Sequence, residues 1–430
     1  MIKVLLIINT IIVLACIRKL CISHHKVDIN HIFCFSFGYL YYCIIPFICF
    51  EWKMSFSGIA YNNMISIYNN ISESRVCYYI ITSLTFYLSF VIGSMQGRIK
   101  YKLINRVSIF HTQDANFNYT QKIAYPIVVL LGIIILFMNR ASLFHGYTYL
   151  VTVDSYDSTR VLLSVYEFVV VICSLYYLNS NPQYSLNKII FNKWMLLFIV
   201  YSLLLISTGG RLYVITALLS FVIFLSFSEN MNFRLIVLLA FGALFALIMG
   251  LIGISRLGFV GLDFKLAVFN ILEEPLYTNY SNITYLYNYS PVNIFCIPTT
   301  LLSAIVNLLP TRLFPWKLDY IKYITDIYPQ IEQPLGATHY YTSYNAGLGL
   351  LLSLFLFYFI GKRMSRIRKS YEDADVTKRT IYCLVCANLA FSMFRDPIAT
   401  SLIKNIIEFS VILPWFISAL NDFLYKEGLK

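Results

Sequence analysis

Residues 203–211 read LLLISTGGR, which ends one apolar run and begins the next. The two runs cover about residues 193–207 and 212–228, and only a few small or polar residues separate them. Apolar runs of this kind, joined by very short connections, are typical of helices that cross a membrane. The stretch therefore predicts a tight hairpin between two spans, and the same pattern recurs along the chain.

The composition indicates the same class of protein. Of the 430 residues, 59% are hydrophobic, 17% aromatic and only 13% charged. Soluble domains have about 45–50% apolar and roughly 25% charged residues. These proportions exclude a secreted disulfide scaffold, a disordered tail protein and a DNA-binding domain. The formal charge of +12 then suggests cytoplasmic anchoring first and an anionic ligand second.

We expect an all-α polytopic membrane protein with about 11 (11–12) transmembrane helices. The apolar runs lie at about 3–17, 32–50, 76–95, 123–139, 161–178, 193–207, 212–228, 235–252, 345–361, 380–394 and 399–420. With the amino terminus outside, the two densest basic clusters, 98–122 and 362–379, share the cytoplasmic side. If a further apolar run, 292–309, crossed the membrane, it would place the basic cluster 362–379 on the outer side. We therefore expect it to be a re-entrant or interfacial helix.

This topology divides the chain into three parts. Residues 1–252 form an eight-span bundle, residues 253–344 form one large external loop that contains the 292–309 helix, and residues 345–430 form three C-terminal spans. Long loops are uncommon unless they are functional, so the external loop and its flanks are where we expect the site.

Two arginines at the outer face are the first candidates for binding an anionic ligand. Arg211 follows a pair of glycines in the hairpin between two spans, and Arg256 opens the external loop. A guanidinium group stays charged and binds phosphate oxygens bidentately. The alternative for each is a side chain that snorkels at a helix end. Further cations on this face are Arg160, Arg312, Lys317 and Arg395.

His339 is the candidate proton acceptor. It lies in GATHYYTSYNAG, residues 336–347, directly before a predicted span. An imidazole there could deprotonate a hydroxyl or hydrogen-bond a ligand, and a structural histidine is the alternative. Nearby aromatic residues suit either sugar contacts or an interfacial aromatic belt: Tyr277, Tyr280 and Tyr285.

Ionisable residues inside apolar runs are a separate group. Glu167 and Glu408 lie within predicted spans, where such residues are functional candidates unless they pair within the bundle. Carboxylates on the outer side are too sparse to predict a metal site, so we expect neither a metal nor a cofactor.

The layout resembles the bacterial O-antigen polymerase (Wzy) family, which is related to the O-antigen ligases. The resemblance rests on STGGR at 207–211, on Ser255-Arg256 opening one large loop, and on the stretch from Pro310 to Lys317. It rests also on THYY at 338–341 before NAGLG at 345–349. It covers most of the chain in architecture. The sequence departs from the ligase pattern because no His–Asn pair stands at 339–340.

The resemblance implies a GT-C-like glycosyltransferase of the bacterial inner (cytoplasmic) membrane that polymerises O-antigen or related repeat units at the periplasmic face. Donor and acceptor would be undecaprenyl-pyrophosphate-linked oligosaccharides, with membrane lipid and a chain-length regulator as further partners and no nucleic acid. Arg211 and Arg256 would hold the pyrophosphate, His339 would orient or deprotonate the acceptor hydroxyl, and the other four cations would assist. A lipid-linked oligosaccharide flippase and an O-antigen ligase are the alternatives.

Overall fold

The computed structural model describes residues 1–23, 26–54, 59–96, 115–140, 158–180, 192–207, 211–227, 264–309, 313–333, 336–369 and 375–428. Helices dominate these ranges. The strands described are β1 (Ile22–Ser23) and β2 (Lys26–Val27), two residues each, which pair antiparallel. The chain divides into two compact units. Unit 1 contains residues 1–100, 233–368 and 388–406, and unit 2 contains residues 101–232, 369–387 and 407–430.

Within the described residues, six helices are long and apolar enough to cross a membrane. They cover residues 2–21, 31–51, 73–96, 121–138, 162–179 and 399–424, and each coincides with a predicted span. An α-helix rises 1.5 Å per residue, so about 20 apolar residues match the ~30 Å hydrocarbon core. The chain is therefore a helical, multi-pass membrane protein, as predicted.

The full count of eleven spans stays a prediction. The runs at 193–207 and 212–228 form the shorter apolar helices α10 (Lys193–Ser207) and α11 (Arg211–Ser226). The run at 235–252 lies outside the described residues. In the 292–309 segment, α14 (Thr299–Asn307) has nine residues and is only about 14 Å long. That length is too short to cross a bilayer.

Unit 1 holds most of the described helices. They are α1 (Ile2–Cys21), α2 (His31–Tyr39), the π-helical turn η1 (Leu40–Ile44), α3 (Ile45–Glu51), α4 (Ile59–Asn69), α5 (Glu73–Gln96), α13 (Phe264–Asn288), α14, η3 (Pro315–Asp319), α15 (Ile324–Ile327), η5 (Thr342–Ala346), α16 (Gly349–Lys369), α18 (Ser392–Arg395) and the beginning of η6 (Ala399–Ile412).

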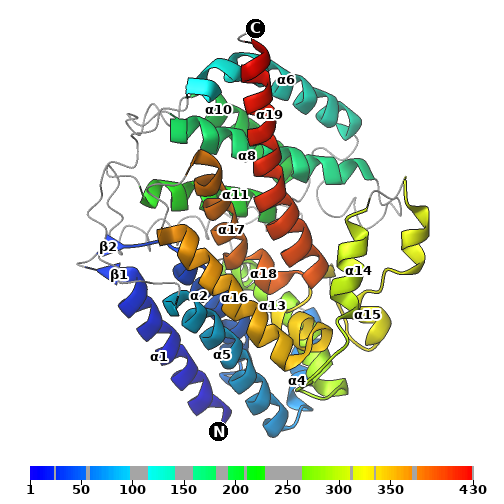
Figure 1. The fold of residues 1–430 in the computed structure, drawn as a ribbon. Coiled ribbons are helices and arrows are strands. Elements are labelled where there is room, and N and C mark those ends of the chain that lie inside the picture. The colour runs from blue at the N-terminus through cyan, green and yellow to red at the C-terminus, as the bar shows by residue number, and fades with distance from the viewer. Residues whose placement is uncertain are drawn as a thin grey trace. The chain divides into compact units, whose positions relative to one another are not determined.

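Two glycines let α5 and α16 pack with their backbones in contact, side by side in Figure 1. A Cβ atom on Gly93 would lie 2.0 Å from the Tyr358 carbonyl oxygen, and one on Gly361 would lie 2.2 Å from the Phe90 carbonyl oxygen. Small residues permit this close approach in membranes, where apolar burial between helices contributes little. The helices α5 and α16 therefore form a closely packed pair within unit 1.

Unit 2 is built around α8 (Ser158–Ser180). This helix is largely buried and contacts α6 (Ala115–Met138), α10 and α11. The unit also contains most of α17 (Val376–Ala390) and α19 (Leu413–Gly428), and α19 packs against α6. By contrast, most of α6 is exposed in this structure.

Candidate functional site

A buried polar network in unit 1 centres on one backbone carbonyl, that of Tyr42 in η1. In an α-helix this oxygen would accept from the N–H four residues later, but residue 46 is proline and has no N–H. The Asn279 amide donates to the Tyr42 oxygen at 3.2 Å, and His339 Nε2 lies 3.2 Å from the same oxygen. The sequence thus frees an acceptor in η1, and side chains from distant segments satisfy it.

His339 is fully buried and uses both ring nitrogens inside the protein. The Tyr341 backbone N–H donates to Nδ1 at 3.2 Å, so Nε2 carries the proton that faces the Tyr42 carbonyl. Burial lowers the pKa of His339 to about 3, against the opposing effect of the Tyr42 hydrogen bond. A neutral imidazole with both nitrogens engaged matches the structural alternative better than the role of proton acceptor.

The helix α13 contributes the polar face that holds the histidine segment. The backbone N–H of His339 donates to the Ser281 hydroxyl at 2.8 Å, and the Asn282 amide donates to Asn279 Oδ1 at 3.1 Å. The Thr342 hydroxyl in turn donates to Asn282 Oδ1 at 3.4 Å. This face ties residues 339–342 to α13 through neutral hydrogen bonds.

Tyr285, for which the sequence left sugar contact and an aromatic belt as alternatives, is fully buried in the same network. Its hydroxyl oxygen accepts from the amides of Asn293, at 3.0 Å, and Asn345, at 3.1 Å. Tyr277 and Tyr280, which precede Tyr285 on α13, are half-buried. Of the three tyrosines, these two retain exposed surface that a ligand could contact.

Arg395 lies in an ion cluster rather than as a free cation. Its guanidinium donates to Glu274 Oε1 on α13 and, at 2.7 Å, to Asp396 Oδ1. Its backbone carbonyl accepts from the Thr338 N–H at 2.7 Å, which links the cluster to the histidine segment. Two carboxylates against one guanidinium leave the cluster net negative, so it is poorly suited to a pyrophosphate.

Lys317 is also engaged. It is 3% exposed, and its ammonium donates to the Asn307 carbonyl at 3.0 Å, to Asn307 Oδ1 at 3.1 Å and to the Leu309 carbonyl. These carbonyls follow the end of α14, where a cation satisfies unpaired acceptors and the helix dipole. Lys317 therefore caps α14, and its three donors are used.

For the remaining predicted cations, the structure describes the backbone of two and nothing of the other two. Arg211 is the first residue of α11 and Arg160 lies in the first turn of α8, but their side chains are outside the described part of the chain. Arg256 and Arg312 lie wholly outside the described residues. Binding of an anionic ligand by Arg211 and Arg256 thus stays a prediction.

A small cleft of about 40 Å³ borders the network. Residues from several segments of unit 1 line it, among them Thr300, Lys322, Gln333, Ser343 and Ile398. A space of this size admits a few water-sized groups, such as a sugar hydroxyl. The lining combines the Lys322 ammonium with the neutral hydroxyl and amide groups of Thr300, Ser343 and Gln333, so the cleft offers hydrogen bonds to a hydroxyl-bearing ligand.

Three π-helical segments, which sequence reasoning missed, meet at this network. The turn η1 supplies the Tyr42 carbonyl, and η5 contacts the beginning of η6 through the Tyr344 and Ser401 hydroxyls, 3.3 Å apart. The Ile398 N–H also donates to Ser343 Oγ at 2.9 Å. Such segments are frequent at functional sites. Proline at 46 and 397 was the one sequence signal that two of them are irregular.

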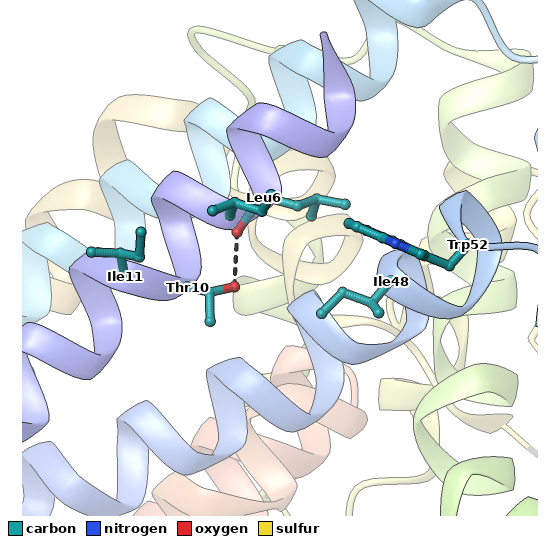
Figure 2. Close-up of a pocket in the computed structure, with 6 residues that line it drawn as sticks. Leu6, Thr10, Ile11, Ile48 and Trp52 are labelled. Carbon is teal, nitrogen blue, oxygen red and sulfur yellow. Dashed lines mark hydrogen bonds between the residues drawn. The ribbon is translucent and has the colours of Figure 1, made fainter.

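A second cavity is purely apolar. Figure 2 shows this groove of about 270 Å³ between α1 and α3, where Leu6, Ile11, Ile48 and Trp52 present hydrocarbon. The Thr10 hydroxyl donates to the Leu6 carbonyl of its own helix at 2.8 Å, so it offers the groove no polar group. Such a surface suits a hydrocarbon chain and offers no polar group for catalysis.

Comparison of the chain with protein-family models, with curated proteins and with solved structures found no match.

Proposed function

We propose that this protein polymerises undecaprenyl-pyrophosphate-linked O-antigen, or related, repeat units at the periplasmic face of a bacterial inner membrane. The observation that carries the proposal is the network of unit 1. Beside this network of neutral hydrogen bonds lies a cleft lined in part by the Thr300 and Ser343 hydroxyls, the Gln333 amide and Lys322. Together with the half-buried tyrosines on α13, these are groups that recognise sugars. The sequence resemblance to the Wzy family supports the same reading.

The reaction would be a glycosyl transfer. The acceptor hydroxyl oxygen attacks the anomeric carbon of the donor, the bond from that carbon to the pyrophosphate oxygen breaks, and undecaprenyl pyrophosphate leaves with the electron pair. The acceptor proton passes to a base. Arg211 and Arg256 are the groups that would stabilise the charge on the leaving pyrophosphate, as the resemblance implies.

The proton acceptor is reassigned in this proposal, because His339 has no free nitrogen. Glu274 is the better candidate: its side chain is 37% exposed, and its carboxylate stands at the edge of the network. Arg395 would hold it in place, so Arg395 acts as a positioning residue rather than as a ligand for phosphate. His339 and Tyr285 would maintain the shape of the site.

The test is a gel of surface polysaccharide from a deletion strain of the source organism carrying each variant. We expect the deletion to reduce the ladder of chain lengths to a single-repeat band, and Arg211→Ala, Arg256→Ala and Glu274→Gln not to restore it at normal membrane abundance. Glu273→Gln, the neighbouring carboxylate on α13, is the matched control and should restore the ladder. A deletion strain that keeps its ladder would exclude the polymerase.

One observation favours a second function, transport of the lipid-linked oligosaccharide. Glu167 lies buried inside a membrane-spanning helix, and buried ionisable residues in membranes often mark transport or proton pathways. Loss of even the single-repeat band in the deletion strain would point to this flippase function or to the ligase. The gel thus separates the polymerase from both alternatives.

A further inference from the structure

Glu167 of unit 2 is a buried carboxyl that forms one hydrogen bond within the described part of the chain. It lies on α8 inside the apolar window 162–179 and is 1% exposed. The Ser202 hydroxyl of α10 donates to its Oε1 at 2.7 Å. Its other oxygen, Oε2, has no hydrogen-bond partner among the residues that the structure describes. A carboxylate that is ionised in such surroundings normally needs a cation or several donors.

A second unpaired polar atom lies beside it. Tyr201, next to Ser202 on α10, is 2% exposed, and its hydroxyl has no partner in the described part of the chain. This tyrosine lies within electrostatic range of Glu167, and its ring is 4.5 Å from the ring of Tyr166. The Tyr166 hydroxyl donates to the Val128 carbonyl at 2.7 Å. The pair of unpaired oxygens therefore spans the contact between α8 and α10.

The helices around α8 present few charges to this position. From α6, Tyr125 lies near Tyr166, and Lys193 at the start of α10 lies over the Tyr125 ring at 4.8 Å. From α11, Tyr213 meets Phe168. Among the side chains that the structure describes, these neighbours bring one cation, Lys193, and it is placed over an aromatic ring. Arg211 opens α11, and its side chain lies outside the described part of the chain.

The other ionisable groups lie farther along α8 or on segments next to it. Arg160 is about two turns, or ~10 Å, from Glu167 along α8. The α17 helix, with Asp375, Lys378 and Arg379 near its start, reaches α8 at Tyr176, about 13 Å along the axis from Glu167. Glu408 adjoins Phe409, which contacts Phe168. Among the described residues, no ion pair to Glu167 is formed.

We propose that Glu167, with Ser202 and Tyr201, is a proton-binding site of the membrane-embedded bundle. In the packed arrangement the site holds the neutral acid, whose Oε1 accepts from Ser202 and whose Oε2 carries the proton toward the Tyr201 side. Loss of this proton would leave a buried carboxylate with a single donor, so the site binds the proton at neutral pH. This inference does not depend on the proposed function.

Infrared spectroscopy of the purified full-length protein in lipid nanodiscs tests the site. At pH 7 we expect a C=O stretching band of a protonated carboxyl that Glu167→Gln removes. The matched control is Glu73→Gln at the exposed start of α5, where the side chain is 59% exposed, and it should leave the band unchanged. A wild-type spectrum without a band that depends on Glu167 overturns the proposal.

Chemical labelling gives a readout that does not depend on a variant folding. Dicyclohexylcarbodiimide reacts with protonated carboxyls in apolar surroundings, whereas an exposed glutamate is only about one part in five hundred protonated at pH 7. The wild-type peptide containing Glu167 should therefore be labelled at least ~10-fold faster than the peptide containing Glu73. Equal or slower labelling of the Glu167 peptide would mean that Glu167 is ionised, which contradicts the proposal.

Discussion

The histidine network of unit 1 and the Glu167 pair of unit 2 are both buried polar groups between helices, and they differ in how they are satisfied. Both ring nitrogens of His339 have partners, and Tyr285 accepts from two amides. In contrast, Glu167 Oε2 and the Tyr201 hydroxyl have none in the described residues. Paired groups fix a shape, whereas unpaired groups that persist in a membrane leave room for a proton or a ligand.

The largest effect should come from removing the cation of the ion cluster. Arg395→Ala leaves Asp396 and Glu274 without their counter-charge, and Asp396 is 7% exposed. We expect about 3 kcal/mol less free energy of unfolding, measured by thermal denaturation of the purified protein. Lys378→Ala removes an exposed pair with Asp375 and should cost below about 1 kcal/mol. Equal losses for both variants would contradict the cluster's role.

Acidification should destabilise unit 1 through His339. The pKa of His339 is about 3 in the fold, below the ordinary value of about 6.5. Between these values the unfolded chain binds a proton that the folded one does not, so stability falls as the pH falls. The contribution from pH 7 to pH 5 is about 2 kcal/mol. In His339→Gln, which cannot titrate, this part of the pH dependence should vanish. If the unfolding free energy of this variant changes with pH as in the wild type, His339 is not buried as a neutral imidazole.

Two matched tyrosine substitutions compare the regions directly. Tyr285→Phe removes a hydroxyl that accepts from Asn293 and Asn345, and we expect a loss of about 1–2 kcal/mol in the free energy of unfolding. Tyr201→Phe removes a hydroxyl that has no partner among the described residues and should be neutral or slightly stabilising, by up to about 1 kcal/mol. The order of the two melting temperatures is the measurement, and a reversed order would refute the contrast between the regions.

The smallest effect is expected for Glu167→Gln. Glutamine has the shape of the neutral acid and can still accept from Ser202, so the free energy of unfolding should change by less than about 0.5 kcal/mol. Removal of an ionised and paired carboxylate would cost about 3 kcal/mol or more. Thermal denaturation at pH 7 separates these values, and the larger loss would mean that Glu167 is charged in the fold.

Six spanning helices could be predicted from the sequence, whereas the partners of the candidate site residues could not, for physical reasons. Six spans follow from local hydropathy alone. The use of Lys317 as a cap depends on where α14 ends, and the pairing of Arg395 depends on Glu274, far away along the chain. His339 was identified by its surroundings in sequence. Its partner carbonyl, freed by Pro46, could be found only once the segments were brought together.

The most direct measurement is reconstitution of the purified protein in liposomes that carry undecaprenyl-pyrophosphate-linked repeat units. If the protein is a polymerase, the lipid-linked chains lengthen by whole repeat units, and undecaprenyl pyrophosphate without sugar accumulates in step with the new linkages. If the wild-type protein moves the repeat units across the bilayer without lengthening them, the proposed function is contradicted. It is contradicted also if the lipid-linked chains keep their original length.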